Sequence, residues 1–147
     1  MSYEAVGTFQ ATSWEETASS ERDDGRKLAH VRASFMYGGD LDGSSEAEYS
    51  LVYVTAETGH YAGFERMTGT LAGRMGSFVL SLTGDFDATS VSAQFTIVDG
   101  SGTGELDGIE GGGTLTWPLG GTEGTFSFTY VLPQPTRSQP ALASTEA

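Results

Sequence analysis

Short runs of alternating apolar and polar residues follow one another along most of the chain, and turns rich in Gly, Asp and Ser separate them. Alternation with a period of two is typical of half-buried β-strands, because successive side chains point to opposite faces. No run has a helical period, although one helical turn is expected near GELDGIEG. We predict eight strands, at residues 4–14, 28–37, 45–54, 60–68, 76–83, 90–98, 111–117 and 124–132.

Eight sequential strands with short connections predict an all-β fold, an eight-stranded antiparallel up-and-down β-barrel, because closure of the sheet removes exposed edges. A sandwich of two sheets is the alternative. We expect residues 1–133 to form this single barrel domain. The segment 134–147 is rich in proline and small polar residues and is expected to be a disordered tail. The charged segment 19–27 is expected to be a loop that can act as a flap over one barrel mouth.

The alternation also predicts which side chains face the barrel interior. In the second, third and sixth runs the apolar set occupies every other position, and the same holds for the fifth and eighth runs. The predicted inner residues are Val31, Ala33, Phe35, Tyr37, Ala47, Tyr49, Leu51, Tyr53, Phe78, Leu80, Leu82, Val91, Ala93, Phe95, Ile97, Phe126, Phe128, Tyr130 and Leu132.

Charge and composition restrict the function classes. The formal net charge is −13, which argues against binding to nucleic-acid backbones or anionic membrane surfaces, since both require a basic patch. The absence of cysteine excludes disulfides, thiolate metal sites and a cysteine nucleophile. The start of the chain has neither a basic segment nor an apolar segment typical of a signal peptide, so we expect a cytoplasmic protein. We also expect no cofactor.

The order and spacing of GTFQATSWEE, GGDLDGSSEAEYSLVY, GFERMTGTLAGRMGSFVLSLTGDF and GSGTGELDGIEGGG resemble a bacterial family of short β-proteins, domain of unknown function 3224. The resemblance extends to about residue 132. That family is similar in fold to allene oxide cyclases and, more distantly, to plant dirigent proteins. The resemblance therefore implies a calycin-like barrel, an apolar lumen that steers a reactive small molecule, and a homo-oligomer. Phe95 stands where relatives often have Trp, which implies a different cavity shape.

Glu65 is the candidate for chemistry, and its orientation depends on the register of the hairpin across TAETG. If Val54 pairs with His60, Glu65 lies on the apolar face opposite Tyr49. If Val54 pairs with the preceding glycine instead, Glu65 points outward beside Glu48, because a slip of one residue reverses every side chain. The apolar stripe that Glu65 forms with its alternate neighbours in 60–68 favours the first register.

An inward Glu65 would have a raised pKa, because desolvation disfavours its charged form, and could act as a general acid or base. Tyr49 or Glu48 would assist it. A structural interpretation stays open beside this one, since a buried glutamate that is hydrogen-bonded to tyrosine or Arg32 can simply fix the barrel register. We expect no metal site, because His30 and His60 lack a metal-binding spacing.

The aromatic and apolar residues expected to line the lumen serve as core and as ligand-binding surface at once. The function expected from the resemblance and from Glu65 is that of a cyclase or isomerase acting on an apolar small molecule. A non-catalytic binding barrel and a structural or oligomeric module are the alternatives. The predicted ligand-binding residues are Trp14, Tyr53, Tyr61, Met67, Phe78, Leu80, Phe95, Trp117 and Phe128.

Overall fold

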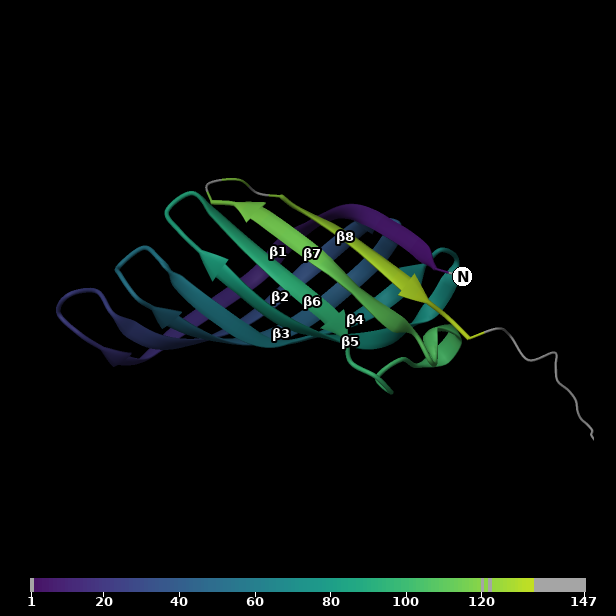
Figure 1. Cartoon of the computed structure of the whole chain (residues 1–147), viewed down its shortest axis with the longest axis horizontal. Helices are drawn as coiled ribbons and strands as arrows, with labels where there is room; N and C mark the ends of the chain where they lie inside the picture. Colours follow the sequence, from purple (N-terminus) through teal and green to yellow (C-terminus); the bar gives the residue numbers. More distant parts are fainter. Residues whose placement is uncertain (1, 120, 122, 134–147) are drawn as a thin grey trace, which may run out of the picture.

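A computed structural model of the chain describes residues 2–119, 121 and 123–133, and the predicted tail at 134–147 lies outside these residues. Eight strands follow one another around a closed barrel in sequence order, each paired antiparallel with its neighbours (Figure 1). The predicted eight-stranded up-and-down barrel is confirmed, and the alternative of a two-sheet sandwich is excluded. Within the described residues no helix has the length and apolarity that a membrane span requires.

The first five strands and the seventh are longer than the sequence pattern predicts, above all at the first hairpin, and the sixth and eighth each end one residue earlier. The first strand continues to Glu21 and the second begins at Lys27, so the expected charged loop at 19–27 shrinks to a turn. The predicted helical turn is present as a short 3₁₀ helix. The elements are β1 (Tyr3–Glu21), β2 (Lys27–Gly39), β3 (Leu41–Tyr53), β4 (Gly59–Leu71), β5 (Arg74–Phe86), β6 (Ser90–Ile97), η1 (Gly104–Leu106), β7 (Glu110–Pro118) and β8 (Gly124–Val131).

Alternation assigns the barrel interior correctly. The apolar positions of β2 from Val31 to Tyr37 are buried, while the polar positions between them face outward or are half-buried. Strands β3, β5, β6 and β8 repeat this pattern. Burial of these apolar side chains is the main favourable contribution to folding, at about 25 cal/mol per Å² of apolar surface removed from water.

The β3–β4 hairpin differs from both predicted registers. Tyr53 pairs with Gly59, and Ala47, not Tyr49, lies opposite Glu65. The favoured register is therefore wrong by two residues, although it places Glu65 on the correct face, because a shift of two preserves the side-chain alternation. The turn that sets the register is closed by the backbone N–H of Val54, which donates to the Thr58 carbonyl.

The two ends of the barrel are built differently. At one end η1 and the residues after it insert Leu106 and Ile109, which are fully buried, and η1 packs against β5. At the other end the β1–β2 hairpin projects beyond the β3–β4 and β5–β6 hairpins, at the left of Figure 1. There β1 pairs with β8 only over Tyr3–Phe9, so the rest of β1 pairs with β2 alone.

Candidate functional site at the open end of the barrel

A cavity of about 640 Å³ occupies the open end of the barrel, and we call it the mouth cavity. Its volume lies in the range of small-molecule pockets, about 300–1,000 Å³. Trp117 lies among several of the cavity's aromatic rings, with ring centroids 5.7 Å from Phe9, 6.0 Å from Phe35 and 6.4 Å from Trp14. The cavity is also lined by Tyr53 and Phe86. Its wall is therefore mainly aromatic, a surface suited to an apolar ligand.

A β-bulge in β1 determines which residues of that strand reach the cavity. Ala11 pairs with Phe35 and Ser13 with Ser34, so Thr12 is an extra residue without a partner on β2. An extra residue reverses the alternation beyond it. As a result Trp14 and Glu16 lie opposite inward-facing residues of β2 and line the mouth cavity.

Glu65 lies at the floor of the mouth cavity and is 1% exposed. Three hydroxyl groups donate to its carboxyl group: Ser45 Oγ to Oε2 at 2.6 Å, Tyr49 Oη to Oε1 at 2.9 Å, and Tyr37 Oη to Oε2. These donors come from β2 and β3, so the cluster joins three neighbouring strands. Within the described residues no Lys, Arg or His forms an ion pair with Glu65.

Burial without a counter-ion dominates the electrostatics of this cluster. Desolvation raises the pKa of Glu65, and the hydrogen bonds from Ser45, Tyr37 and Tyr49 oppose that rise without cancelling it. The pKa values of Tyr37 and Tyr49 are raised well above the ordinary range, first by burial and then by the nearby charge of Glu65. Both tyrosines therefore keep their protons and act as donors across the physiological pH range.

Two glycines make room for the tyrosine rings at the floor. A Cβ on Gly63 would come within 2.8 Å of the Tyr49 ring, and one on Gly84 within 2.8 Å of the Tyr61 ring. The two rings meet edge to face with centroids 5.3 Å apart. The absence of side chains at Gly63 on β4 and Gly84 on β5 thus leaves room for both rings against the barrel wall.

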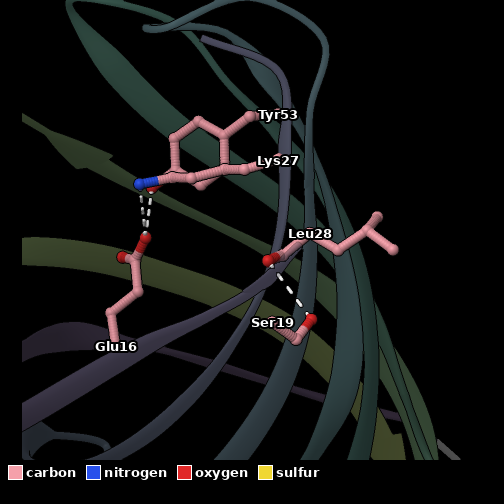
Figure 2. Close-up of polar contacts among 5 residues, drawn as sticks. All are labelled: Glu16, Ser19, Lys27, Leu28 and Tyr53. Carbon is pink, nitrogen blue, oxygen red and sulfur yellow. Dashed lines mark hydrogen bonds and ion pairs between the residues drawn. The ribbon is translucent and has the colours of Figure 1, made fainter. Parts of the chain in front are cut away.

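A second glutamate accepts a tyrosine hydroxyl at the entrance to the cavity (Figure 2). Tyr53 Oη donates to Glu16 Oε2 at 2.6 Å, and Lys27 Nζ lies 3.7 Å from the same oxygen. The Lys27 amine also lies 4.3 Å from the centre of the Tyr53 ring, a cation–π distance. Nearby, Ser19 Oγ donates to the Leu28 carbonyl and joins β1 to β2. Glu16 is therefore paired with a cation, unlike Glu65.

The structure brings together six of the residues predicted to form the site. Glu65 and Tyr49 are hydrogen-bonded, although they are not opposite each other in the sheet. Diagonal neighbours remain within reach of a long side chain, which explains the contact. The predicted residues that line the mouth cavity are Trp14, Tyr49, Tyr53, Tyr61, Glu65 and Trp117.

Six predicted site residues lie elsewhere. Glu48 is on the outer face of β3, where its carboxylate lies 3.3 Å from His30, so it cannot assist Glu65. Glu48 directly precedes the inward-facing Tyr49, and adjacent residues of a strand point to opposite faces. The other five are buried in the packed half of the barrel, below the floor of the cavity, because alternation gives the face of a residue but not its depth along the barrel axis. They are Met67, Phe78, Leu80, Phe95 and Phe128.

The histidines lie on the outer surface. His60 pairs with Asp85, and both side chains are more than half exposed. No group of three or more His, Cys, Asp or Glu side chains with metal-binding geometry is found in the part of the chain that the structure describes. The expectation of a metal-free protein stays a prediction.

Tyr37, Ser45 and Glu16 belong to the site and were not predicted as part of it. The alternation predicts Tyr37 on the inner face of its strand, but not its contact with Glu65, because the sheet register aligns Tyr37 through Gly43 with Gly69, four residues from Glu65. Ser45 is the one small polar residue at a buried position of β3, 3% exposed. The inward orientation of Glu16 depends on the bulge at Thr12, which no sequence pattern predicts.

Comparisons with known proteins agree with the fold. A family model described as "Protein of unknown function (DUF3224)" matches residues 5–130. A crystal structure of a protein of unknown function from that family, from Shewanella oneidensis MR-1, matches with a TM-score of 0.70 and 24% sequence identity, covering 91% of this chain and 100% of that chain. A search of curated proteins found no match. The expected similarity to allene oxide cyclases and dirigent proteins stays a prediction.

Proposed function

We propose that this chain, which belongs to the DUF3224 family, is a small-molecule enzyme of the cyclase or isomerase type that holds an apolar metabolite in the mouth cavity. One observation carries the proposal: the carboxyl group of Glu65 lies without a counter-ion at the floor of a cavity whose walls are mainly aromatic. Pairing of an apolar pocket with a carboxyl group of raised pKa is a common arrangement for proton transfer near neutral pH.

The hydrogen bonds indicate which oxygen of Glu65 would act. Oε2 accepts two hydroxyls and Oε1 accepts one, so Oε1 keeps a lone pair for a proton from the ligand. As a carboxylate, Glu65 would take a proton from the carbon next to a carbonyl, and the C–H electron pair would form an enolate with its charge on the carbonyl oxygen. Where a C=C bond of the ligand is conjugated with the enolate, return of the proton to the far carbon of that system shifts the double bond and completes an isomerisation.

The cavity walls would contribute positioning. Aromatic rings on several strands surround the ligand, and a flexible ligand held in one folded conformer has already lost the entropy that a cyclisation requires. Exclusion of water from the floor leaves the carboxylate of Glu65 poorly solvated, which makes it a stronger base.

A non-catalytic binding barrel is the second candidate, and the three hydrogen bonds to Glu65 favour it. Three hydroxyls donate to a side chain that is 1% exposed, an arrangement that can serve stability alone. Both candidates require ligand binding in the mouth cavity, and they differ in whether a proton is transferred.

One experiment distinguishes the enzyme from the binding barrel: proton NMR follows the exchange of the carbon-bound protons of 2-tetralone in heavy water. An enzyme should exchange the protons next to the carbonyl faster than buffer does, and Glu65→Gln should slow the exchange by about 100-fold or more. Glu48→Gln is the matched control, because Glu48 lies on the outer face of the neighbouring strand. If 2-tetralone binds but exchanges at the buffer rate, the binding barrel is the better description. If it does not bind, both candidates lose their support.

A further inference from the structure

Four tyrosines line the mouth cavity, and three of their hydroxyls are already hydrogen-bonded. Tyr37 and Tyr49 donate to Glu65, and Tyr53 donates to Glu16. The hydroxyl of Tyr61 has no hydrogen-bond partner among the residues that the structure describes. Trp14 also lines the cavity without such a partner, but it is 48% exposed and water can reach its indole N–H. Among the described residues, Tyr61 therefore supplies the tyrosine hydroxyl of the cavity that is free to donate to a ligand.

The position of Tyr61 is fixed by its surroundings. It lies on the inner face of β4, four residues before Glu65. Its ring packs against Tyr49 and over Gly84. Burial, then the charges of Glu65 and Asp85, raise the pKa of Tyr61, so its hydroxyl stays protonated. A protonated hydroxyl held by packing in the wall of an apolar cavity is suited to donate to an oxygen acceptor of the ligand.

The charges around the cavity restrict the acceptor. Four carboxyl groups line the mouth cavity, those of Glu16, Glu57, Glu65 and Asp87, and no Lys or Arg is among its lining residues. The nearest described cation, Lys27, is paired with Glu16. A ligand carboxylate would meet like charge at the entrance and again at the floor, which disfavours it. An uncharged acceptor meets no such repulsion.

We propose that Tyr61 donates a hydrogen bond to the carbonyl oxygen of an uncharged apolar ligand, so that the substrate class is neutral carbonyl compounds and not fatty-acid anions. This inference rests on the proposed function, because it assigns the ligand of the same cavity. It also gives the carbonyl a place beside Glu65, with its neighbouring carbon toward the carboxyl group.

Three ring compounds of similar size test the proposal: 2-tetralone carries a ketone, tetralin carries no oxygen, and 1,2,3,4-tetrahydro-2-naphthoate carries a carboxylate. Binding to the full chain can be followed by tryptophan fluorescence, since both tryptophans of the sequence line the cavity. The ketone should bind about five- to tenfold more tightly than tetralin, the gain from one hydrogen bond, and the carboxylate should bind most weakly.

Tyr61→Phe should lower the affinity for 2-tetralone to that for tetralin and leave tetralin binding unchanged. Tyr130→Phe, which removes a hydroxyl at the packed end of the barrel, is the control and should change neither. The infrared C=O stretch of bound 2-tetralone should move to higher frequency in Tyr61→Phe, as expected for a lost hydrogen bond.

Equal binding of 2-tetralone and tetralin to the wild-type chain overturns the role of Tyr61 and leaves the apolar cavity of the proposed function intact. So does an unchanged affinity in Tyr61→Phe. The wild-type comparison needs no variant, so a folding defect in Tyr61→Phe would not remove the test. Tightest binding of the carboxylate overturns the assignment of a neutral ligand. Absence of binding by all three compounds overturns both this inference and the proposed function.

Discussion

Two glutamates accept tyrosine hydroxyls in this barrel, one at the floor of the mouth cavity and one at its entrance. Glu65 accepts three hydroxyls, has no cation beside it and is 1% exposed. Glu16 accepts one hydroxyl, lies 3.7 Å from the Lys27 amine, and its side chain is 23% exposed. The same pair of residue types therefore forms a desolvated carboxyl group with a raised pKa in one place and a partly solvated ion pair in the other. Depth in the barrel, more than residue identity, determines the chemistry.

Truncation of each glutamate to alanine should show the largest difference between the two sites, in the free energy of unfolding. Glu65→Ala leaves three buried hydroxyls without their acceptor and opens a cavity, so we expect a loss of about 2–4 kcal/mol in the free energy of unfolding. Glu16→Ala should lose under about 1 kcal/mol, as is typical of partly exposed pairs. Urea denaturation of both variants measures the difference. Equal losses would show that water satisfies the floor as readily as the entrance.

The pH dependence of stability is the next largest difference. Because the pKa of Glu65 is raised in the folded state, the unfolded chain releases this proton first as pH rises. The contribution of Glu65 to stability is therefore complete below its ordinary pKa, falls as pH rises to the raised pKa, and is constant above it. Each unit by which the pKa is raised corresponds to about 1.4 kcal/mol.

Glu65→Gln should remove this decline, so the variant gains stability relative to the wild type as pH rises through that window. Urea midpoints across a pH series give the difference between the two curves. Glu48→Gln, on the outer face, serves as the control for the loss of one carboxyl group. Parallel curves for the wild type and Glu65→Gln would contradict the raised pKa.

The smallest effect concerns the cation at the entrance. Lys27→Met removes the ion pair with Glu16 and the contact with the Tyr53 ring, and should destabilise the protein by under about 1 kcal/mol at low salt. The loss should shrink in about 1 M salt, where exposed charges are screened. The shift in the thermal midpoint at the two salt concentrations measures it. A loss that is independent of salt would indicate that the Lys27 stem acts through packing alone.

The alternation of the sequence predicts the barrel and the inward direction of Glu65, because faces depend only on local pattern. It cannot predict the pairing of Ala47 with Glu65, since registers that differ by two residues place the same side chains inward. The turn between Val54 and Thr58 selects among them through contacts that the pattern does not encode.

The composition of the site depends on features that no single strand contains. Tyr37 and Ser45 reach Glu65 diagonally across neighbouring strands, from positions that are four and two residues out of register with it, and Glu16 faces the cavity only because Thr12 is bulged. Phe95 and Phe128 share the inner face with the cavity residues, yet they pack against each other in the filled half of the barrel. Depth along the axis follows from the stagger of neighbouring strands, which is a property of the whole barrel.

The limited pairing of β1 with β8 has a consequence for the behaviour of the protein at high concentration. Beyond Phe9, no described strand other than β2 pairs with β1, and an unpaired edge is a template on which strands of other chains can add and aggregate. Two bulges interrupt this edge, after Ala11 and after Ala18, and the acidic residues Glu15, Glu16 and Glu21 lie along it. An incoming copy would meet an uneven hydrogen-bonding line and its own negative charge, and both disfavour the addition of a strand at this edge.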